Sequence, residues 1–166
     1  MLILPYALPI FLTAILWKGM LNVDFGIINQ ILPGNVNWLG EPMLARLSVL
    51  FVNLWIAYPY FLVVCTGALT AIPGDLKEAA FVDGASGLHA FRTIVLPLLM
   101  PTTLFIAVNA MINSVKLIDH LFILTKGGPS DASKLILYYI WEMAFAFFDA
   151  PHAAAITVLV IAVLGV

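Results

Sequence analysis

Two long stretches of the sequence, residues 47–72 and 94–115, contain no charged side chain and consist mostly of apolar residues. A helix needs about 20 such residues to cross about 30 Å of hydrocarbon. Both stretches reach this length, so each predicts a membrane-spanning helix. The composition agrees, because 63% of the 166 residues are hydrophobic and only 10% are charged, unlike the proportions of soluble domains. We therefore expect an all-α integral membrane protein.

Further apolar segments lie at the two ends of the chain. Residues 1–18 carry no charge before Lys18, and the prolines in this segment are tolerated in membrane helices whose neighbours satisfy the freed carbonyl groups. We expect spans at about 1–18, 47–72, 94–118 and 152–166. Because the sequence begins and ends inside apolar runs and carries no recognisable secretory signal peptide, we expect a bundle truncated at both ends.

Residues 135–149 form a different kind of apolar segment. The segment is shorter than a membrane span and is rich in Tyr, Trp and Phe around Glu142. This pattern is typical of a helix that lies in the membrane interface. We expect an interfacial helix here, and a tilted span remains the alternative. The preceding Gly127-Gly128-Pro129 indicates a turn.

Charge and cysteine content exclude several classes of protein. The net charge is −2 and no basic cluster is present, which argues against binding of nucleic acid. Cys65 is the single cysteine, so it cannot belong to a disulfide framework, and we expect it to pack within a span. The basic residues are shared evenly among the connections, so the positive-inside rule gives no orientation.

The connection at residues 73–93 is too polar for the membrane and has helical signals. Asp75 and Glu78 have the spacing of a capping box, and Gly84 suits the left-handed position after a helix. Ser86 can cap a second short helix. The sequence therefore predicts a structured loop of two helices.

The same loop has features of a contact surface. In its second helix Leu88 and Phe91 are three residues apart and fall on one side. In its first helix Ala79 and Ala80 should leave a smooth patch, and small residues permit close approach of another protein.

This loop contains a family signature. The order is Glu78-Ala79-Ala80, three residues, Gly84, nine residues, Ile94, one residue, and Leu96-Pro97. It resembles the EAA motif of ABC importer permeases. Other stretches resemble permeases of the maltose and glycerol-phosphate type: LPYALP at 4–9, YPY at 58–60, AIPGDLKEAAFVDGA at 71–85, LPLLMP at 96–101 and GGP at 127–129.

The resemblance implies a fold and a set of partners. Such permeases have a core of six spans, and this chain corresponds to the third span through part of the sixth in the type I importer fold. The partners implied are a second permease subunit, an ABC ATPase dimer and an extracytoplasmic solute-binding protein, in the cytoplasmic (inner) membrane of a bacterium or archaeon. The loop at 73–93 would be cytoplasmic and would couple to the ATPase through Glu78, Ala79, Ala80, Asp83, Gly84, Ala85, Leu88 and Phe91.

No catalytic centre is recognisable in the sequence. It contains no phosphate-binding loop, and His89, His120 and His152 do not have metal-site spacing. We expect a transport subunit that is not an enzyme, with no metal or cofactor of its own. ATP and magnesium would bind the separate ATPase chain.

Polar residues inside the first long span are candidates for a solute path. Asn53, Ala57 and Tyr60 fall on one helical face, and maltose-type permeases have sugar-contacting residues at the matching positions. Asn and Tyr can bond hydroxyl groups, and Tyr also offers a ring to a sugar. Hydrogen bonding between helices is the alternative role.

The second long span carries another polar set. We expect a stripe of Asn109, Asn113, Lys116 and His120, with Ser114 and Asp119 beside it. Asn113, Ser114, Lys116 and Asp119 are candidate path residues. Lys116 and Asp119 could equally form a snorkelling pair at the interface. This set departs from the maltose-type pattern, and Lys116 leaves room for an anionic solute such as a glycerol phosphate.

The sequence thus predicts a permease that moves a sugar or sugar-like solute by alternating access. An ion-coupled secondary transporter would favour carboxylates inside the spans, whereas every Asp and Glu here lies outside the uncharged runs. A membrane scaffold without transport is a further alternative. Co-purification of an ATPase would distinguish the importer from it.

Overall fold

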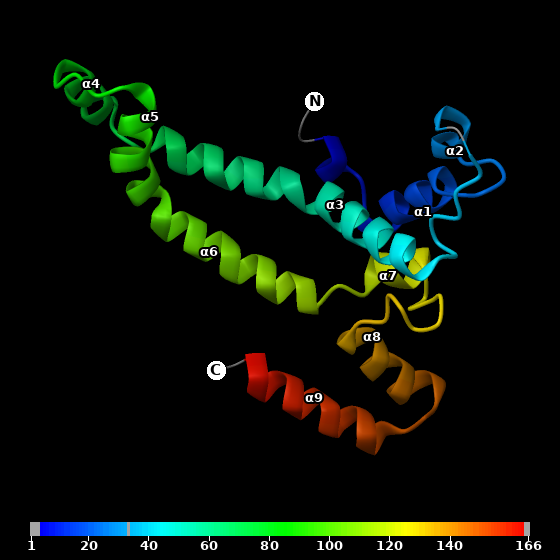
Figure 1. The fold of residues 1–166 in the computed structure, drawn as a ribbon. Helices are drawn as coiled ribbons and strands as arrows, with labels where there is room; N and C mark the ends of the chain where they lie inside the picture. The colour runs from blue at the N-terminus through cyan, green and yellow to red at the C-terminus, as the bar shows by residue number, and fades with distance from the viewer. Residues whose placement is uncertain (1–3, 33, 165–166) are drawn as a thin grey trace. The chain divides into compact units, whose positions relative to one another are not determined.

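The computed structural model describes residues 4–32 and 34–164, and these residues form helices and no strand (Figure 1). They divide into two compact units. One unit contains the residues up to 56 together with those from 112 onward, and the other contains residues 57–111.

The first long helix, α3, runs over Pro42–Thr70. Its 29 residues rise about 44 Å, enough to cross a bilayer with a turn to spare at each end. It starts five residues before the predicted span because Pro42 is preorganised for the first helical position. The charged Arg46 is part of the helix, although it lies outside the uncharged run.

The second long helix is continuous through three segments: α5 (Gly87–Ala90), the π-helix η2 (Phe91–Val95) and α6 (Leu96–Val115). It begins before the predicted 94 and ends at Val115, three residues before the predicted 118. Among the described residues, two stretches are long and apolar enough to cross a membrane, Pro42–Thr70 and Gly87–Leu124. The second stretch includes the non-helical residues 116–118 and α7 (Asp119–Leu124).

The N-terminal segment is not one continuous helix over the expected 1–18. A 3₁₀ turn at Leu4–Ala7 is followed by α1 (Ile10–Met20), with Pro9 as its N-cap. Proline disfavours the helical conformation of the residue before it, which explains the break at Leu8. The 11 residues of α1 rise only about 17 Å. Residues 1–3 lie outside the described part of the chain.

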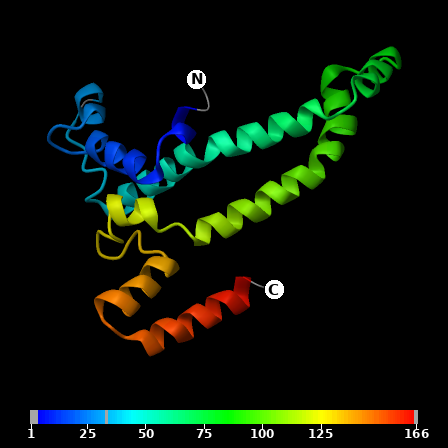
Figure 2. The ribbon, with the colours of Figure 1, turned by 180° about the vertical axis from the view of Figure 1, so that it is seen from behind.

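Two short helices form the C-terminal part. Helix α8 (Ile136–Trp141) and the π-helix η3 (Glu142–Ala146) together rise about 17 Å, less than a bilayer requires. This length favours the interfacial helix over a tilted span. Helix α9 (Ala150–Leu164) follows and rises about 22 Å. It contacts α8, and both views show the two helices as a hairpin (Figures 1 and 2).

The core of the first unit lies where α1 packs against α7, and residues of α3 and α8 also belong to it. Trp17 makes edge-to-face contacts with Phe51 and Trp55, at ring-centroid distances of 5.0 and 5.6 Å. The ammonium of Lys18 donates to the carbonyl of Ile123 at 2.8 Å, and so satisfies a free carbonyl near the end of α7. The buried cluster consists of Trp17, Leu21, Val49, Val52, Leu117, Leu121, Leu124 and Tyr138.

Large apolar side chains cover much of the outer surface of the helices. In α9, for example, Val158 and Val163 are 66% and 78% exposed. Soluble monomers rarely expose contiguous apolar patches of this kind. A surface of this composition fits lipid or neighbouring membrane helices.

Candidate functional site

The first helix of the 73–93 loop is α4 (Gly74–Val82). Its N-cap is Pro73, and no side chain bonds the free N–H groups there. The predicted capping box of Asp75 and Glu78 is therefore wrong. The helix starts at Gly74, which places Asp75 inside the first turn, where its carboxylate still interacts favourably with the helix dipole.

The end of α4 follows the prediction. Gly84 has φ +80°, the left-handed conformation that glycine adopts at little cost. Around it the N–H of Ala85 donates to the carbonyl of Ala80 at 2.9 Å, and the N–H of Gly84 donates to Phe81 at 3.1 Å. This pair of bonds is a Schellman motif. A Cβ at Gly84 would meet nothing within 4 Å, so conformation rather than space favours glycine.

The start of α5 also follows the prediction. The Ser86 hydroxyl accepts a hydrogen bond from the backbone N–H of His89 at 3.3 Å, as an N-cap side chain should. The loop is therefore two short helices, one ended by Gly84 and the next begun by Ser86.

The loop exposes several large apolar side chains. Phe81, Val82 and Leu88 are 57%, 87% and 62% exposed, and Phe91 is exposed as well. Glu78, Ala79 and Asp83 are also exposed, and Ala85 is half-buried. A rigid hairpin with this much apolar surface is typical of a protein contact.

Ala80 does not contribute to the outer patch that the sequence predicts. It is buried, as is Ala90, and α4 contacts α5. The small side chain of Ala80 permits this close packing. Beside it, a groove of about 720 Å³ follows the loop, and its lining includes Ala79, Ala80, Asp83, Gly84, Ala85 and His89.

In the other unit, two predicted path residues line one pocket. Asn53 of α3 and Ser114 near the end of α6 face the same cavity of about 330 Å³. We call this cavity the Asn53 pocket. The rest of its lining is Arg46, Val49, Leu50, Leu117, Ala132, Ser133, Lys134 and Leu135. It combines apolar walls with a few polar groups, as solute sites generally do.

Hydrogen bonds hold the polar wall of the Asn53 pocket in place. The Arg46 Nε donates to the carbonyl of Ala132 at 2.6 Å, which ties the start of α3 to the turn after α7. The Lys134 ammonium lies 2.7 Å from both Asp131 and Glu142. Hydrogen bonds to Asp131 and Glu142 raise the pKa of Lys134 above its ordinary value. Its positive charge is therefore balanced by neighbouring carboxylates.

Hydrogen bonds between hydroxyl and carbonyl groups stabilise the turn at residues 126–134. The hydroxyls of Thr125 and Ser133 are 2.7 Å apart, and Ser133 donates to the carbonyl of Gly128 at 2.6 Å. Ser133 is buried, so these contacts keep its polar atom satisfied. The turn thus presents a defined surface to the Asn53 pocket.

The remaining predicted path residues do not line the Asn53 pocket. Ala57 and Tyr60 belong to the unit of residues 57–111, where both are half-buried. The Tyr60 ring makes an edge-to-face contact with Phe61 at 5.5 Å. Asn113 and Lys116 are exposed.

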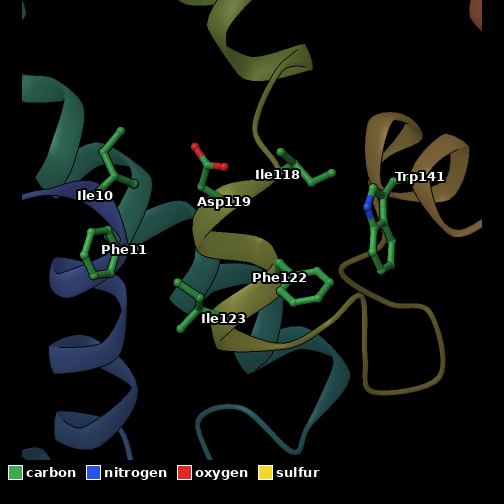
Figure 3. Close-up of a pocket in the computed structure, with 7 residues that line it drawn as sticks. All are labelled: Ile10, Phe11, Ile118, Asp119, Phe122, Ile123 and Trp141. Carbon is green, nitrogen blue, oxygen red and sulfur yellow. The ribbon is translucent and has the colours of Figure 1, made fainter. Parts of the chain in front are cut away.

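Asp119 lies at the start of α7 in an apolar hollow of about 640 Å³. Figure 3 shows its carboxylate between Ile10 of α1 and Ile118. Within the described residues, Lys116 and Asp119 form no ion pair with each other. The helix ends at Val115, so a spacing of three residues no longer brings the two side chains to one face.

His120 was wrongly assigned to the polar stripe of α6. It belongs to α7 and is 6% exposed, and α7 packs against α1. Its Nε2 has no hydrogen-bond partner among the described residues. The break at residues 116–118 takes His120 out of the register of Asn109 and Asn113.

Sequence reasoning missed Arg46, Ser133 and Lys134 as pocket residues. Arg46 precedes an uncharged run, and Ser133 and Lys134 follow a glycine-rich turn. Polar residues are expected at such positions, so their presence there did not indicate a pocket. The contact between Arg46 and Ala132 joins residues 86 positions apart, and a single sequence contains no signal for it. No group of three or more His, Cys, Asp or Glu within the described ranges could hold a metal ion.

Comparisons with known proteins bear on the resemblance drawn from the EAA motif. The family model described as "Binding-protein-dependent transport system inner membrane component" matches residues 1–166. The maltose/maltodextrin transport system permease protein MalF of Vibrio cholerae is 37% identical over 183 aligned positions, covering 99% of this chain and 34% of the relative. MalF of Escherichia coli K12 is 38% identical, covering 99% of this chain and 35% of its own length.

A solved structure supports the fold. A chain in the crystal structure of a bacterial ABC transporter involved in the import of the acidic polysaccharide alginate matches with a TM-score of 0.88 at 23% identity. The match covers 97% of this chain and 58% of that one. It confirms the predicted helical fold of ABC importer permeases.

The match to the family model spans the whole chain, whereas the chain spans about one third of the curated relatives. The predicted resemblance to importer permeases is confirmed. The chain belongs to the family of binding-protein-dependent transport system inner membrane components.

Proposed function

We propose that this chain forms part of the permease of an ATP-driven importer that takes up a sugar or a sugar-like solute. The observation that carries the proposal is the rigid helical hairpin of α4 and α5, with its exposed apolar face and the EAA motif. The maltose/maltodextrin permeases among the relatives support the solute class.

The hairpin is suited to dock in a groove of an ATPase subunit. Helix-in-groove recognition uses exposed apolar anchors, which Leu88 and Phe91 supply here. The Schellman motif at Gly84 and the cap at Ser86 fix both helix ends. A rigid element can transmit a rigid-body movement that a flexible segment would absorb. ATP and magnesium would bind the ATPase dimer.

The Asn53 pocket is the part of this chain best suited to line the solute path. Asn53 and Ser114 offer groups that can bond solute hydroxyls. A solute-binding protein would deliver the solute, and a second permease subunit would complete the path. Closure of the ATPase dimer would then shift the permease between outward-open and inward-open states.

An anionic solute is the second candidate, and Arg46 favours it. Arg46 lines the Asn53 pocket and is exposed, and its Nε donates to the backbone carbonyl of Ala132. Among the described residues it forms no ion pair, so its charge is not balanced by a carboxylate. A guanidinium of this kind recognises carboxylate or phosphate groups.

Cross-linking tests the proposed ATPase contact. The Cys65→Ser, Leu88→Cys permease would be assembled with its ATPase carrying single cysteines along the candidate groove. We expect a disulfide at one groove position, and none from Cys65→Ser, Asn35→Cys, which lies in the connection between α2 (Ile27–Ile31) and α3. Equal cross-linking of both variants, or of neither, would contradict the contact.

Competition of uptake by neutral and phosphorylated sugars distinguishes the two solute classes.

A further inference from the structure

The helix that begins in the 73–93 loop, which we call the coupling loop, contains one unusually wide turn. The backbone N–H of Leu96 donates to the carbonyl of Phe91, five residues earlier, rather than four. The flanking residues Ala90 (φ −58°, ψ −41°) and Leu96 (φ −63°, ψ −45°) are helical. Phe91–Val95 is therefore a π-turn with one extra residue inside an otherwise continuous helix, and such turns occur frequently at functional sites.

The second residue after the π-turn, Pro97, explains why a wide turn fits here. Pro97 has no backbone N–H, and in a regular α-helix its ring would collide with the carbonyl four residues earlier, that of Thr93. A wider turn relieves this collision. Leu96-Pro97 is also the end of the EAA motif, at a fixed distance from Gly84.

We propose that Pro97 is a positioning residue, which maintains the π-turn and thereby sets the face of the helix on which Leu88 and Phe91 lie. The inference rests on the proposed coupling function of the loop. One residue corresponds to about 100° of rotation and 1.5 Å of rise in an α-helix. Whether the turn is π or α therefore decides the direction in which the docking residues point.

Two other prolines provide the comparison. Pro59 lies inside α3 and Pro101 lies inside α6, and both are surrounded by regular α-helix. Proline alone therefore does not impose a π-turn, and a wide turn requires an extra residue to be present. Pro101 is four positions from Pro97 in the same helix, which makes it a matched control.

The substitution Pro97→Ala restores the missing N–H and removes the ring, so the turn can relax to α. The extra residue would then rotate Leu88 and Phe91 by about 100° relative to α6. Deleting Thr93 in the same variant removes the extra residue and returns these side chains to their original face. Thr93 is exposed, so its deletion disturbs little packing.

The experiment measures uptake by the complete importer in vesicles, normalised to the amount of assembled complex. For Pro97→Ala we expect uptake to fall by about tenfold, within the range of coupling factors between sites. We expect Pro101→Ala to remain near wild type and Pro97→Ala with Thr93 deleted to recover most of the uptake. A role of Pro97 in folding alone would not be rescued by shortening the helix.

Two results would overturn the positioning role: full uptake by Pro97→Ala, or failure of the Thr93 deletion to restore uptake or assembly. A parallel Gly84→Val variant separates this inference from the proposed function. If Gly84→Val abolishes uptake while the deletion does not rescue Pro97→Ala, only the positioning role is wrong. If Gly84→Val transports normally, the coupling function itself fails.

Discussion

The backbone N–H of Ala85 donates to the carbonyl of Ala80 at 2.9 Å, across the left-handed Gly84. This bond ends α4 and sets the direction in which the chain enters α5. Ala80 is buried and α4 contacts α5, so the hydrogen bond and the packing of the two helices restrict the same geometry. The loop that carries the EAA motif is therefore held by its own backbone.

The cap at the start of α5 provides a local test of this rigidity. Replacement of Ser86 with Ala removes the acceptor of the His89 N–H and should destabilise the first turn by about 1 kcal/mol. Hydrogen exchange of the His89 amide in the assembled permease should accelerate accordingly. Ser86→Thr keeps a hydroxyl, so the exchange rate of the His89 amide in this variant should stay near that of the wild type. Equal exchange in all three proteins would show that the cap contributes nothing.

The membrane topology follows from one intervening span. Along the chain, the 73–93 loop comes before the α6 span and the turn at 126–134 comes after it, so the two should face opposite compartments. In a Cys65→Ser background, Leu88→Cys should react with an impermeant reagent only from the cytoplasmic side. Ser130→Cys should react only from the other side. Reaction of both from one side would contradict the predicted orientation.

The Asn53 pocket predicts a modest and specific loss of transport. Replacing Asn53 or Ser114 with Ala would remove the proposed hydrogen bond to the solute, worth about 1 kcal/mol or roughly fivefold in affinity. The apparent KM for uptake should rise while co-purification of the ATPase is unchanged. The same substitution at the exposed Asn35, in the connection between α2 and α3 and outside the pocket lining, serves as the comparison. Loss of assembly in Asn53→Ala would instead indicate a packing role.

A pH dependence should appear at the start of α9. The carboxylate of Asp149 accepts a hydrogen bond from the His152 backbone and lies 2.6 Å from its ring. The side-chain hydrogen bond of His152 lowers the pKa of Asp149. A depressed pKa stabilises the fold above the unfolded value, about 3.9, and this contribution is lost as pH falls through the folded value.

We therefore expect the first turn of α9 to lose hydrogen-exchange protection as pH falls below about 4. Asp149→Asn keeps an acceptor for the His152 amide without the titrating charge. The ratio of protection between the wild type and this variant cancels the intrinsic pH dependence of exchange. A ratio that stays constant with pH would contradict the role of Asp149.

Local chemistry was largely predictable from the sequence. The conformation of Gly84 and the cap of Ser86 depend on neighbouring residues only, and both predictions are confirmed. The long uncharged runs likewise predicted α3 and α6. The cap of α4 was not predictable in the same way. Both Pro73 and Asp75 can precede the first turn of a helix, and in the structure Pro73 is the N-cap residue.

Features that depend on contacts between residues far apart in the chain could not be predicted from the sequence. His120 has the spacing of a pathway residue, yet the chain leaves the helix at 116–118 and buries it in α7. The hydrogen bond from Arg46 to Ala132 joins residues that are 86 positions apart in the sequence. Such contacts arise from packing between elements, which the periodicity of one segment does not encode.

The most direct test of the coupling role compares one substitution at two glycines. A Cβ at Gly84 or at Gly87 would meet nothing within 4 Å, and of the two only Gly84 has a left-handed φ. Valine at position 84 should strain the loop by at least about 1–2 kcal/mol, whereas valine at position 87 should fit. The measurement is solute uptake together with binding-protein-stimulated ATP hydrolysis in vesicles. We predict that Gly84→Val loses both while Gly87→Val keeps both; full uptake and hydrolysis in Gly84→Val would contradict a coupling role for this loop.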